Sequence, residues 1–467
     1  MKALIIAAGQ GNRLKHLTKD APKPLIQLLG LSLIERVILT VKRSGINEFV
    51  IVIGYLGDKI KAKLGDGNRY GVKINYIENR EWEKENGISV LKAKELLNEN
   101  FVLLMADHIF DDRILKALIN YDTRSSVILA VDRGKPLPGD TKVLEKKGKI
   151  VDIGKDIEES NCIDTGIFLC SPKISSYIEE AIEESKTELA DGVAKAVKDG
   201  EAEVFDITKI ESYNSTMRKD VKPWWVDIDT EEDLRKTEKI ILANASKNPS
   251  DLLACYIHKP IENKLVAFIS NFNITPNQLT IIVNILAYTV TTLFFLGYLL
   301  PASIITFIVG VVDGLDGKLA RVKLMTSKLG SIEHSFDLLF EFSWFIALSW
   351  FLFSSTQSAL PLILCIFIIL FIAFYRHVYD QFRRATGRSL DDCGDFERIF
   401  RRVAGRRNLY NIPILVFILL GVPLYSLIFI LVHSGITAIV YSLRAMKHLY
   451  AMDRSYLKHS GETPTQV

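Results

Sequence analysis

The chain has 467 residues with a formal net charge of +3, and its five cysteines form no CxxC pair. This length is too great for one hydrophobic core and predicts at least two domains. The nearly balanced charge excludes a strongly polyanionic partner, so we expect no nucleic acid. The cysteine pattern indicates reduced, structural thiols.

The first residues form an apolar run, ALIIAAG, that leads directly into a glycine-containing loop. The run is too short for a signal peptide and predicts a buried strand over 2–8. Backbone N–H groups of a glycine loop after a strand can surround a triphosphate. Dinucleotide binding is the alternative, but the loop lacks the GxGxxG spacing. The candidate phosphate-binding residues are Ala8, Gly9 and Gly11 in the loop, with Arg13 and Lys23 offsetting the phosphate charge.

Seven apolar segments of strand length alternate with helical segments in the first half of the chain. This alternation predicts an α/β, Rossmann-like domain with a mostly parallel sheet and helices on both of its faces. The predicted strands are 2–8, 48–53, 73–77, 101–105, 125–131, 166–170 and 203–205.

Two aspartates follow apolar segments in this half: Asp107 ends LLMAD, and Asp227 lies in WWVDID. Carboxylates are ligands that Mg²⁺ and Mn²⁺ prefer, so the two aspartates could hold such a cation if the fold brings them together. For Asp107 alone, a strand-end cap is the competing interpretation. That interpretation weakens when Arg13, Lys23 and Asp227 are considered with it. We interpret His108 as structural.

The glycine loop and the sequence APKPL at 21–25 together resemble the sugar-1-phosphate nucleotidyltransferases, over about 1–240. The resemblance implies a nucleotidyl transfer that depends on a divalent metal. The residues it implies are Asp107 and Asp227 for the metal, Arg13 and Lys23 for catalysis, Asn86 and Ser89 for the nucleotide, and Asp164, Thr165 and Gly166 for the substrate.

The character of the sequence changes near residue 250, after which long segments carry few or no charges. Leu279–Leu300 has no charged residue and is long enough to span a bilayer, which needs about 20 residues. Thr275 and Pro276 precede it as N-cap and first helical residue. A buried core helix is the alternative for any one segment, but six in succession predict an all-α, six-helix transmembrane domain. The other predicted spans are 302–322, 331–354, 359–379, 424–443 and the short 409–422, which contains Pro413.

Basic residues gather on alternate loops of this half. The linkers 298–302 and 354–358 contain no Lys or Arg, whereas the loop 376–407 is rich in arginine. Because basic loops remain in the cytoplasm, we expect both termini to be cytoplasmic. The arginines of this loop, Arg406 among them, could bind a phosphorylated substrate or contact anionic lipid.

Asp251–Ser270 mixes apolar and basic residues ahead of the first span. It predicts either an interfacial amphipathic helix, interrupted at Pro260, or an ordinary linker helix. We therefore expect a cytosolic domain at 1–245, a linker with this helix at 246–275, a membrane domain at 276–450 and a loose tail at 451–467.

Two pairs of carboxylates lie near the cytoplasmic ends of the second and third spans. Asp313 and Asp316 are three residues apart, and Glu333 and Asp337 are four apart, so each pair shares one helix face. An ionised carboxylate in hydrocarbon costs at least about 2.5 kcal/mol, so the pairs indicate a shared site for a divalent cation. Interfacial charges solvated at helix ends are the alternative, and this alternative adequately explains Glu341.

The sequence DGLDGKLAR at 313–321, with Gly330 after it, resembles the signature of the CDP-alcohol phosphotransferases, over about 252–450. Where that signature continues with an aspartate, this chain has His334, preceded by Glu333. Members of that family transfer the phospho-alcohol group of a CDP-alcohol to an acceptor hydroxyl and release CMP. The resemblance implies a homodimer, metal binding by Asp313, Asp316, Glu333 and Asp337, catalysis by Asp337 as general base, and nucleotide contacts from Gly317, Ala320 and Arg321.

The first half would form a nucleotide-activated alcohol and the second would consume a CDP-alcohol, which favours CTP as the nucleotide. This combination resembles the family of bifunctional inositol-1-phosphate cytidylyltransferase/di-myo-inositol phosphate phosphate synthases. The resemblance implies CTP and a polyol phosphate as substrates and a phosphorylated or lipid acceptor. The alternatives are a phospholipid head-group synthase with a degenerate N-terminal domain, and a non-enzymatic membrane anchor for a soluble transferase. The presence of Arg13, Lys23, Asp107 and Asp227 disfavours degeneracy.

Overall fold

The computed structural model describes residues 1–460 with several short gaps, and it divides the chain into two compact units. Unit 1 comprises Met1–Tyr213 and Asp220–Ala243, and unit 2 comprises Asn214–Lys219 and Asn244–Val467. For residues 213–215, 218–220, 333–334 and 455–460 only the backbone is described. The residues outside the description are 12–13, 15–17, 19–20, 212, 216–217, 247–257, 327–332 and 461–467.

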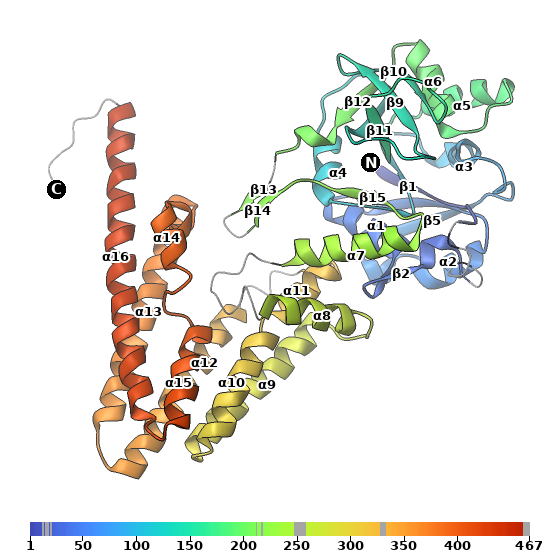
Figure 1. The fold of residues 1–467 in the computed structure, drawn as a ribbon. Coiled ribbons are helices and arrows are strands. Elements are labelled where there is room, and N and C mark those ends of the chain that lie inside the picture. The colour runs from blue at the N-terminus through green and yellow to red at the C-terminus, as the bar shows by residue number, and fades with distance from the viewer. Residues whose placement is uncertain are drawn as a thin grey trace. The chain divides into compact units, whose positions relative to one another are not determined.

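A nine-stranded sheet forms the centre of unit 1, with strand order β5-β4-β1-β6-β11-β8-β12-β10-β9 (Figure 1). All seven predicted strands belong to it. The strands β5, β4, β1 and β6 run parallel, as do β8 and β12. The nine strands are β1 Lys2–Ala7, β4 Glu48–Ile53, β5 Lys73–Glu78, β6 Phe101–Met105, β8 Val127–Asp132, β9 Lys142–Lys146, β10 Lys149–Gly154, β11 Cys162–Cys170 and β12 Ala202–Asp206.

Strand β11 departs from the expected parallel arrangement, because it runs antiparallel to β6, β8 and β9. Between β8 and β11 the chain forms only the β9–β10 hairpin and two loops. A parallel return would need a longer crossover, usually a helix. The hairpin was not predicted, because its sequence KVLEKKGKIVDIG is rich in charge and gives little apolar signal.

Helices cover both faces of the sheet. On one face, Leu4, Val50 and Leu103 join apolar residues of α3, α5 and α6 in a single core cluster. Alternate strand residues such as Ile5 and Ile51 are equally buried, and they point to the opposite face. The helices of this unit are α1 Leu33–Arg43, α2 Gly57–Leu64, α3 Asn86–Lys92, α4 Asp112–Ile119, α5 Ile174–Glu183, α6 Leu189–Lys198 and α7 Glu231–Ala245, whose last residues belong to unit 2.

Three two-stranded sheets lie outside the main sheet. One of them joins β7 to β15, and it positions the first candidate site. The short strands are β2 Gln27–Leu28, β3 Leu31–Ser32, β7 His108–Phe110, β13 Tyr213–Ser215, β14 Arg218–Val221 and β15 Trp225–Asp227.

Unit 2 is helical throughout the part of it that the structure describes, apart from the short β13–β14 pair. Among the described residues, five stretches are long and apolar enough to cross a membrane: Pro276–Phe295, Leu299–Val322, Ser335–Thr356, Leu360–Thr386 and Leu424–Arg454. Together with the carboxylate motif they indicate a membrane protein. The helices are α8 Lys259–Ser270, α9 Pro276–Phe295, α10 Leu299–Val312, α11 Leu315–Val322, α12 Glu333–Thr356, α13 Leu360–Thr386, α14 Asp395–Phe400, α15 Arg407–Leu419 and α16 Leu424–Ser460.

The sixth predicted span corresponds to α15, which is an apolar helix of only 13 residues with Pro413 inside it. At 1.5 Å per residue it is about 20 Å long, shorter than a hydrocarbon core of about 30 Å. The number of crossings and the side of the termini therefore stay predictions. The start of the first span agrees closely with the sequence, since Thr275 caps α9 in a capping box with Gln278 and Pro276 follows it.

Two helices differ from the expected boundaries. The C-terminal helix α16 continues to Ser460, so residues 451–460 are helical rather than a loose tail, and residues 461–467 lie outside the described residues. Pro260 does not interrupt α8 but lies in its first turn, where a missing N–H costs no hydrogen bond. Residues 251–257 of the predicted amphipathic helix lie outside the described residues.

Candidate active sites

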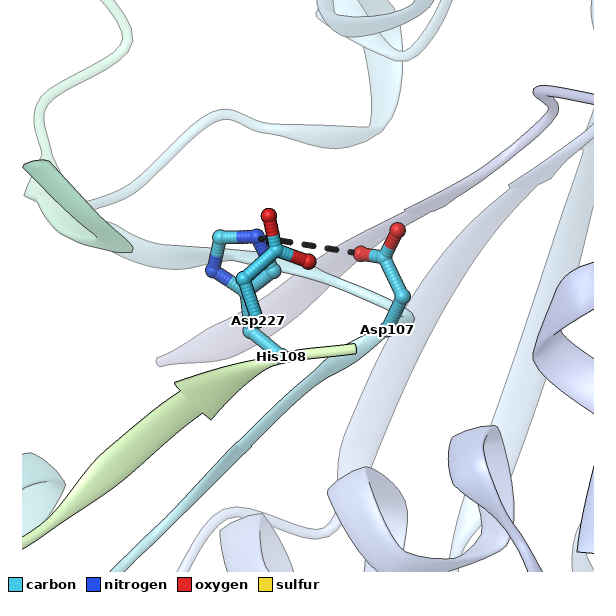
Figure 2. Close-up of side chains that lie close together, drawn as sticks. All are labelled: Asp107, His108 and Asp227. Atoms are coloured by element: carbon cyan, nitrogen blue, oxygen red, sulfur yellow. Dashed lines mark ion pairs between the residues drawn. The ribbon is translucent and has the colours of Figure 1, made fainter. Parts of the chain in front are cut away.

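The pairing of β7 with β15 brings the first acidic cluster together. In this antiparallel pair Asp227 lies opposite His108, and the Ile228 amide donates to the Asp107 carbonyl oxygen at 3.3 Å. Asp107 directly precedes β7, close to the carboxyl end of β6. Figure 2 shows the three side chains pointing toward one another. His108 Nε2 lies 3.5 Å from Asp227 Oδ1 and 3.9 Å from Asp107 Oδ1.

Lys23 places an ammonium group against these carboxylates. Its Nζ lies 2.7 Å from Asp107 Oδ2, 2.8 Å from Asp229 Oδ1 and 3.9 Å from Asp227 Oδ1. The lysine is 7% exposed and begins the 3₁₀ turn Lys23–Leu25, which forms the KPL part of the motif. Gly11 packs against it with φ +70°, and a Cβ at position 11 would meet Lys23 Cβ at 2.6 Å. The glycine loop and the lysine are therefore one packed unit.

The charges of this cluster shift its ionisation. Burial alone would lower the pKa of Lys23, but the surrounding aspartates raise it well above its ordinary value. Burial would raise the pKa of Asp107, but Lys23 and His108 hold it below its usual range. Burial raises the pKa of Asp227 to about 6, against the effect of His108. Burial would lower the pKa of His108, but Asp227 and Asp107 raise it.

The cluster fits a divalent cation. One donor atom from each of Asp107, His108 and Asp227 lies within 4.8 Å of the others, the one such group among the described residues. Asp227 Oδ1 is buried and has no hydrogen-bond partner there. Carboxylate oxygens are the ligands that Mg²⁺ and Mn²⁺ prefer. From the sequence alone we interpret His108 as structural and do not predict it as a metal ligand. A structural contact is present as well, because His108 Nδ1 lies 2.7 Å from the Thr165 carbonyl oxygen.

The predicted DTG turn lies beside the cluster. A Cβ on Gly166, which has φ +70°, would meet His108 Nδ1 at 2.3 Å, so only glycine fits there. The Gly166 amide donates to Asp164 Oδ1 at 2.7 Å, and the buried Thr165 hydroxyl donates to the Ala130 carbonyl oxygen at 2.7 Å. Burial raises the pKa of Asp164 to about 6. The turn therefore supports the cluster directly.

The predicted nucleotide-binding residues of α3 are engaged in the protein interior. Asn86 Oδ1 accepts from the Leu189 amide at 2.8 Å, at the start of α6. Ser89 is buried, and its hydroxyl accepts from Asn79 Nδ2 at 3.0 Å. Of the other predicted residues, Ala8 is buried, and its carbonyl oxygen accepts from the Tyr55 amide at 2.9 Å. Gly9 has open space at its Cα. Arg13 lies outside the described residues.

The second acidic cluster lies where α10 gives way to α11. Asp313 is the C-cap of α10, and Asp316 lies in the first turn of α11, so a break at Gly314 separates the two aspartates. Asp316 is 2% exposed; it accepts from the Thr280 hydroxyl of α9 and from the Gly317 amide at 2.6 Å. These bonds fix one carboxylate of the motif to a neighbouring helix.

Arg407, at the start of α15, connects the two acidic helices. It forms an ion pair with Asp313, and it interacts electrostatically with Asp337 and Glu341 of α12. Asp313 and Asp337 also interact electrostatically with each other. The guanidinium lies 4.8 Å from the centre of the Phe340 ring. The sequence prediction singled out the neighbouring Arg406 instead.

Glu341 is not a solvated charge at a helix end, as the sequence suggested. It is 1% exposed and forms an ion pair with Arg376 of α13 at 2.5 Å. Its second oxygen, Oε1, has no hydrogen-bond partner among the described residues. A buried carboxylate in a membrane domain is costly and needs a partner. Glu341 therefore belongs to the charged interior beneath the acidic motif.

The other predicted residues of this site lie around α11. Arg321 donates to the Ala245 carbonyl oxygen at 2.6 Å, and a Cβ on Gly317 would meet its guanidinium at 3.4 Å. Ala320 accepts from the Met325 amide at 2.8 Å, and Arg406 is the N-cap residue of α15. The side chain of Glu333 lies outside the described residues, so the third carboxylate of the motif stays a prediction.

Two regions of the chain match known protein families. Residues 2–244 match the nucleotidyl transferase family. The chain belongs to this family. Residues 273–392 match the CDP-alcohol phosphatidyltransferase family, so this nucleotidyl transferase also carries a domain of the second kind. The chain is an enzyme of two parts, and the predicted fusion is confirmed.

Similar proteins share this arrangement. A protein of Aquifex aeolicus named "Bifunctional IPC transferase and DIPP synthase" is 29% identical over 432 residues, covering 90% of this chain and 92% of its own. Proteins of the same name from Rubrobacter xylanophilus and Archaeoglobus fulgidus are 29% and 27% identical over 336 and 430 residues. These alignments cover 71% and 90% of this chain, and 72% and 79% of the two relatives.

Proposed function

We propose that this enzyme forms CDP-inositol from CTP and an inositol phosphate, and then transfers the phospho-inositol group to an acceptor hydroxyl with release of CMP. The observation that carries the proposal is the presence in one chain of two carboxylate sites, each with its own basic side chain. The printed name of the relatives, an IPC transferase joined to a DIPP synthase, supports inositol phosphate as the alcohol donor. The acceptor is a phosphorylated polyol or a lipid.

In the first reaction a phosphate oxygen of the inositol phosphate attacks the α-phosphorus of CTP, and the bond to the β-phosphate breaks to release pyrophosphate. Asp107 and Asp227 would hold Mg²⁺ or Mn²⁺, which offsets phosphate charge when bound. Lys23 and Arg13 bind and orient the triphosphate. Catalysis here is mostly positioning and charge neutralisation. The DTG turn at 164–166 would hold the alcohol.

In the second reaction the acceptor oxygen attacks the phosphorus that carries inositol, and the bond to CMP breaks. Asp337 takes the proton of the acceptor hydroxyl as general base. Asp313, Asp316 and Glu333 would hold the divalent cations at the diphosphate. Arg321 and Gly317 lie next to each other on α11 and would contact the nucleotide.

The proposal places the first reaction at 1–245 and the second within 276–450, in a membrane domain with both termini in the cytoplasm. Five stretches of sufficient length and apolarity support this location, and six crossings and a homodimer remain part of the proposal. A cytoplasmic first site has access to CTP, and its product needs no membrane crossing to reach the second site.

The test is product analysis by mass spectrometry of the full chain in nanodiscs with CTP, Mg²⁺ and inositol 1-phosphate. We expect pyrophosphate, CDP-inositol and CMP. Parallel reactions with glycerol 3-phosphate or with UTP control for the alcohol and the base. If another CDP-alcohol forms but CDP-inositol does not, inositol phosphate is not the substrate, although the enzyme is still a cytidylyltransferase. If no CDP-alcohol forms, the first reaction as proposed is contradicted.

The phospholipid head-group synthase remains a second candidate, because the acceptor is not identified by the site. Two reactions distinguish the candidates: CDP-inositol supplied with inositol phosphate as the acceptor, and CDP-inositol supplied with diacylglycerol as the acceptor. CMP release with only the lipid acceptor would favour the synthase.

A further inference from the structure

The segment 395–404, which joins α13 to α15, presents two unlike faces. It begins with α14 and continues in helical turns, since the Arg401 and Ala404 amides donate to Glu397 and Phe400 at 3.0 and 2.8 Å. It lies beside α16 in Figure 1. The segment follows the region that matches the CDP-alcohol phosphatidyltransferase family, which ends at 392.

The inner face of this segment is held by buried ion pairs. Glu397 is 4% exposed and accepts from Arg444 and from His448 Nε2, the latter at 2.7 Å, both on α16. Arg401 is 8% exposed and pairs with Asp391 and the Tyr379 hydroxyl. A buried charge that lost its partner would cost several kcal/mol, so these pairs fix the rotation of the segment.

The outer face is apolar. Phe396, Ile399 and Val403 are 50%, 64% and 45% exposed. Their spacing of three and four residues places them on one helical face. Each such side chain, if left in water, forgoes roughly 1.5–3 kcal/mol of burial. Because the inner ion pairs fix the rotation, the segment cannot turn this face inward.

If the first residues of α13 and α16 mark one edge of the hydrocarbon layer, the two helices place this face at the opposite edge. Arg444 follows Leu424, the first residue of α16, by 20 residues (444 − 424), and Tyr379 follows Leu360, the first residue of α13, by 19 (379 − 360). At 1.5 Å per residue both distances are about 30 Å, the thickness of a bilayer core. Two independent helices therefore give the same height for the segment.

The surroundings of the apolar face are basic. Five arginines in 380–404 are exposed, against the exposed acids Asp380 and Asp395. Each basic residue near an anionic membrane surface contributes about 1 kcal/mol to attraction. The exposed arginines are Arg383, Arg384, Arg388, Arg398 and Arg402.

We propose that segment 395–404 lies in the headgroup layer and binds anionic phospholipid, with its apolar face toward the acyl chains and the surrounding arginines at the phosphates. This assigns the exposed arginines of the loop to lipid. Arg407, which forms an ion pair with Asp313, remains with the acidic cluster, and Arg406 keeps its predicted role in the reaction. The proposal does not depend on the identity of the alcohol or the nucleotide.

The test is the depth of a spin label in the full chain, reconstituted in phosphatidylcholine vesicles with and without phosphatidylglycerol. Single cysteines replace Ile399, Val151 and Val432 in a chain whose native cysteines are substituted and whose CMP release is retained. Val151 is exposed on β10 of unit 1, and Val432 is exposed on α16 near the midpoint between Leu424 and Arg444. They serve as water and lipid references for collision with a nickel chelate and with oxygen.

We expect the label at 399 to collide with oxygen more, and with nickel less, than the label at 151, at a depth between the two references. A water-like pattern at 399 would overturn the proposal. Low collision with both reagents would also overturn it, because it would show that protein covers the face.

A second experiment tests whether the arginines of the segment bind anionic lipid. Adding phosphatidylglycerol should move the label at 399 toward the lipid pattern, and Arg398→Gln with Arg402→Gln should weaken this shift, because each arginine contributes about fivefold to partitioning. The matched control Arg80→Gln with Arg124→Gln changes two arginines of unit 1 and should leave the shift intact. A label that responds equally in all three chains would overturn the assignment to anionic lipid.

Discussion

The two acidic clusters use different basic side chains to balance their carboxylates. In unit 1, Lys23 lies between Asp107 and Asp229, and in unit 2, Arg407 pairs with Asp313. Lysine is a point charge on a flexible stem, whereas the arginine fork is planar and keeps its charge in almost any environment. Lys23 can therefore follow a phosphate during the reaction, while Arg407 is suited to remain as a fixed counter-charge.

The environment explains this difference. The Lys23 cluster lies outside the carboxyl ends of parallel strands, where a charged ligand can enter and replace one partner with another. The Arg407 cluster lies among membrane helices and is backed by the buried pair Glu341–Arg376. There an uncompensated charge is expensive in every state of the reaction. The comparison predicts separable activities and unequal tolerance of charge changes.

The largest expected effect is at Asp337, the proposed general base of the second reaction. Asp337→Asn should lower CMP release by about 100- to 10,000-fold, because a neutral amide cannot accept the acceptor proton. Pyrophosphate release from CTP and inositol phosphate should stay within twofold of the wild-type rate (an estimate for distant, independent sites). Both are measured on the same preparation. Equal loss of the two activities would contradict separate sites.

A substitution at the first site should have the opposite selectivity, lowering pyrophosphate release but not CMP release. Asp107→Asn removes a proposed metal ligand and an ion-pair partner of Lys23, and should lower pyrophosphate release about 100- to 1,000-fold. CMP release from supplied CDP-inositol should persist. His108→Ala tests the residue that the sequence did not single out; an unchanged Mg²⁺ requirement in this variant would remove His108 from the metal site.

Substitutions of Arg407 test whether this arginine is a fixed counter-charge in unit 2. Arg407→Gln leaves the largely buried Asp313 without its ion-pair partner and should destabilise unit 2 by about 3–5 kcal/mol. Arg407→Lys should recover stability in part, since it restores the charge but not the planar fork. Thermal unfolding in detergent measures the effect, and Arg388→Gln, an exposed change, is the control. Equal stability of Arg407→Gln and wild type would show that Arg407 is not a required counter-charge.

The smallest expected effect is on the pH dependence of the first reaction. Burial raises the pKa of Asp227 to about 6, so this carboxyl takes up a proton as the pH falls through about 6. A protonated carboxyl is a poor metal ligand, and the apparent KM for Mg²⁺ in pyrophosphate release should therefore rise below that pH. An exposed aspartate, with a pKa of about 4, would leave this KM unchanged down to about pH 5. Such a flat profile would contradict a ligand role for buried Asp227.

The sequence predicted the parts of the molecule that depend on local pattern. The apolar strands, the capped start at Thr275, and the motif aspartates all carry their signal within a few residues. Strands β7 and β15 have three residues each, too few for a periodic signal, so the pairing of Asp227 with His108 was not predictable. The hairpin β9–β10 escaped prediction because its surface charges mask the alternation.

Long-range charge partners were also beyond the sequence. Glu341 and Arg376 are 35 residues apart, and Arg407 is 94 residues from Asp313. Nothing local distinguishes Arg407 from Arg406, because the choice depends on how α15 begins and which side chain faces α10. Helix packing, rather than spacing along the chain, selects these partners.

The central claim is that the two sites act in series through a CDP-alcohol. The most direct measurement is a time course with isotopically labelled inositol phosphate, CTP, Mg²⁺ and acceptor, followed by mass spectrometry. The account predicts that label enters CDP-inositol first and then passes to the final product as CMP appears. Labelled final product that forms without a labelled CDP-inositol pool, in the wild-type chain and in Asp337→Asn alike, would contradict it.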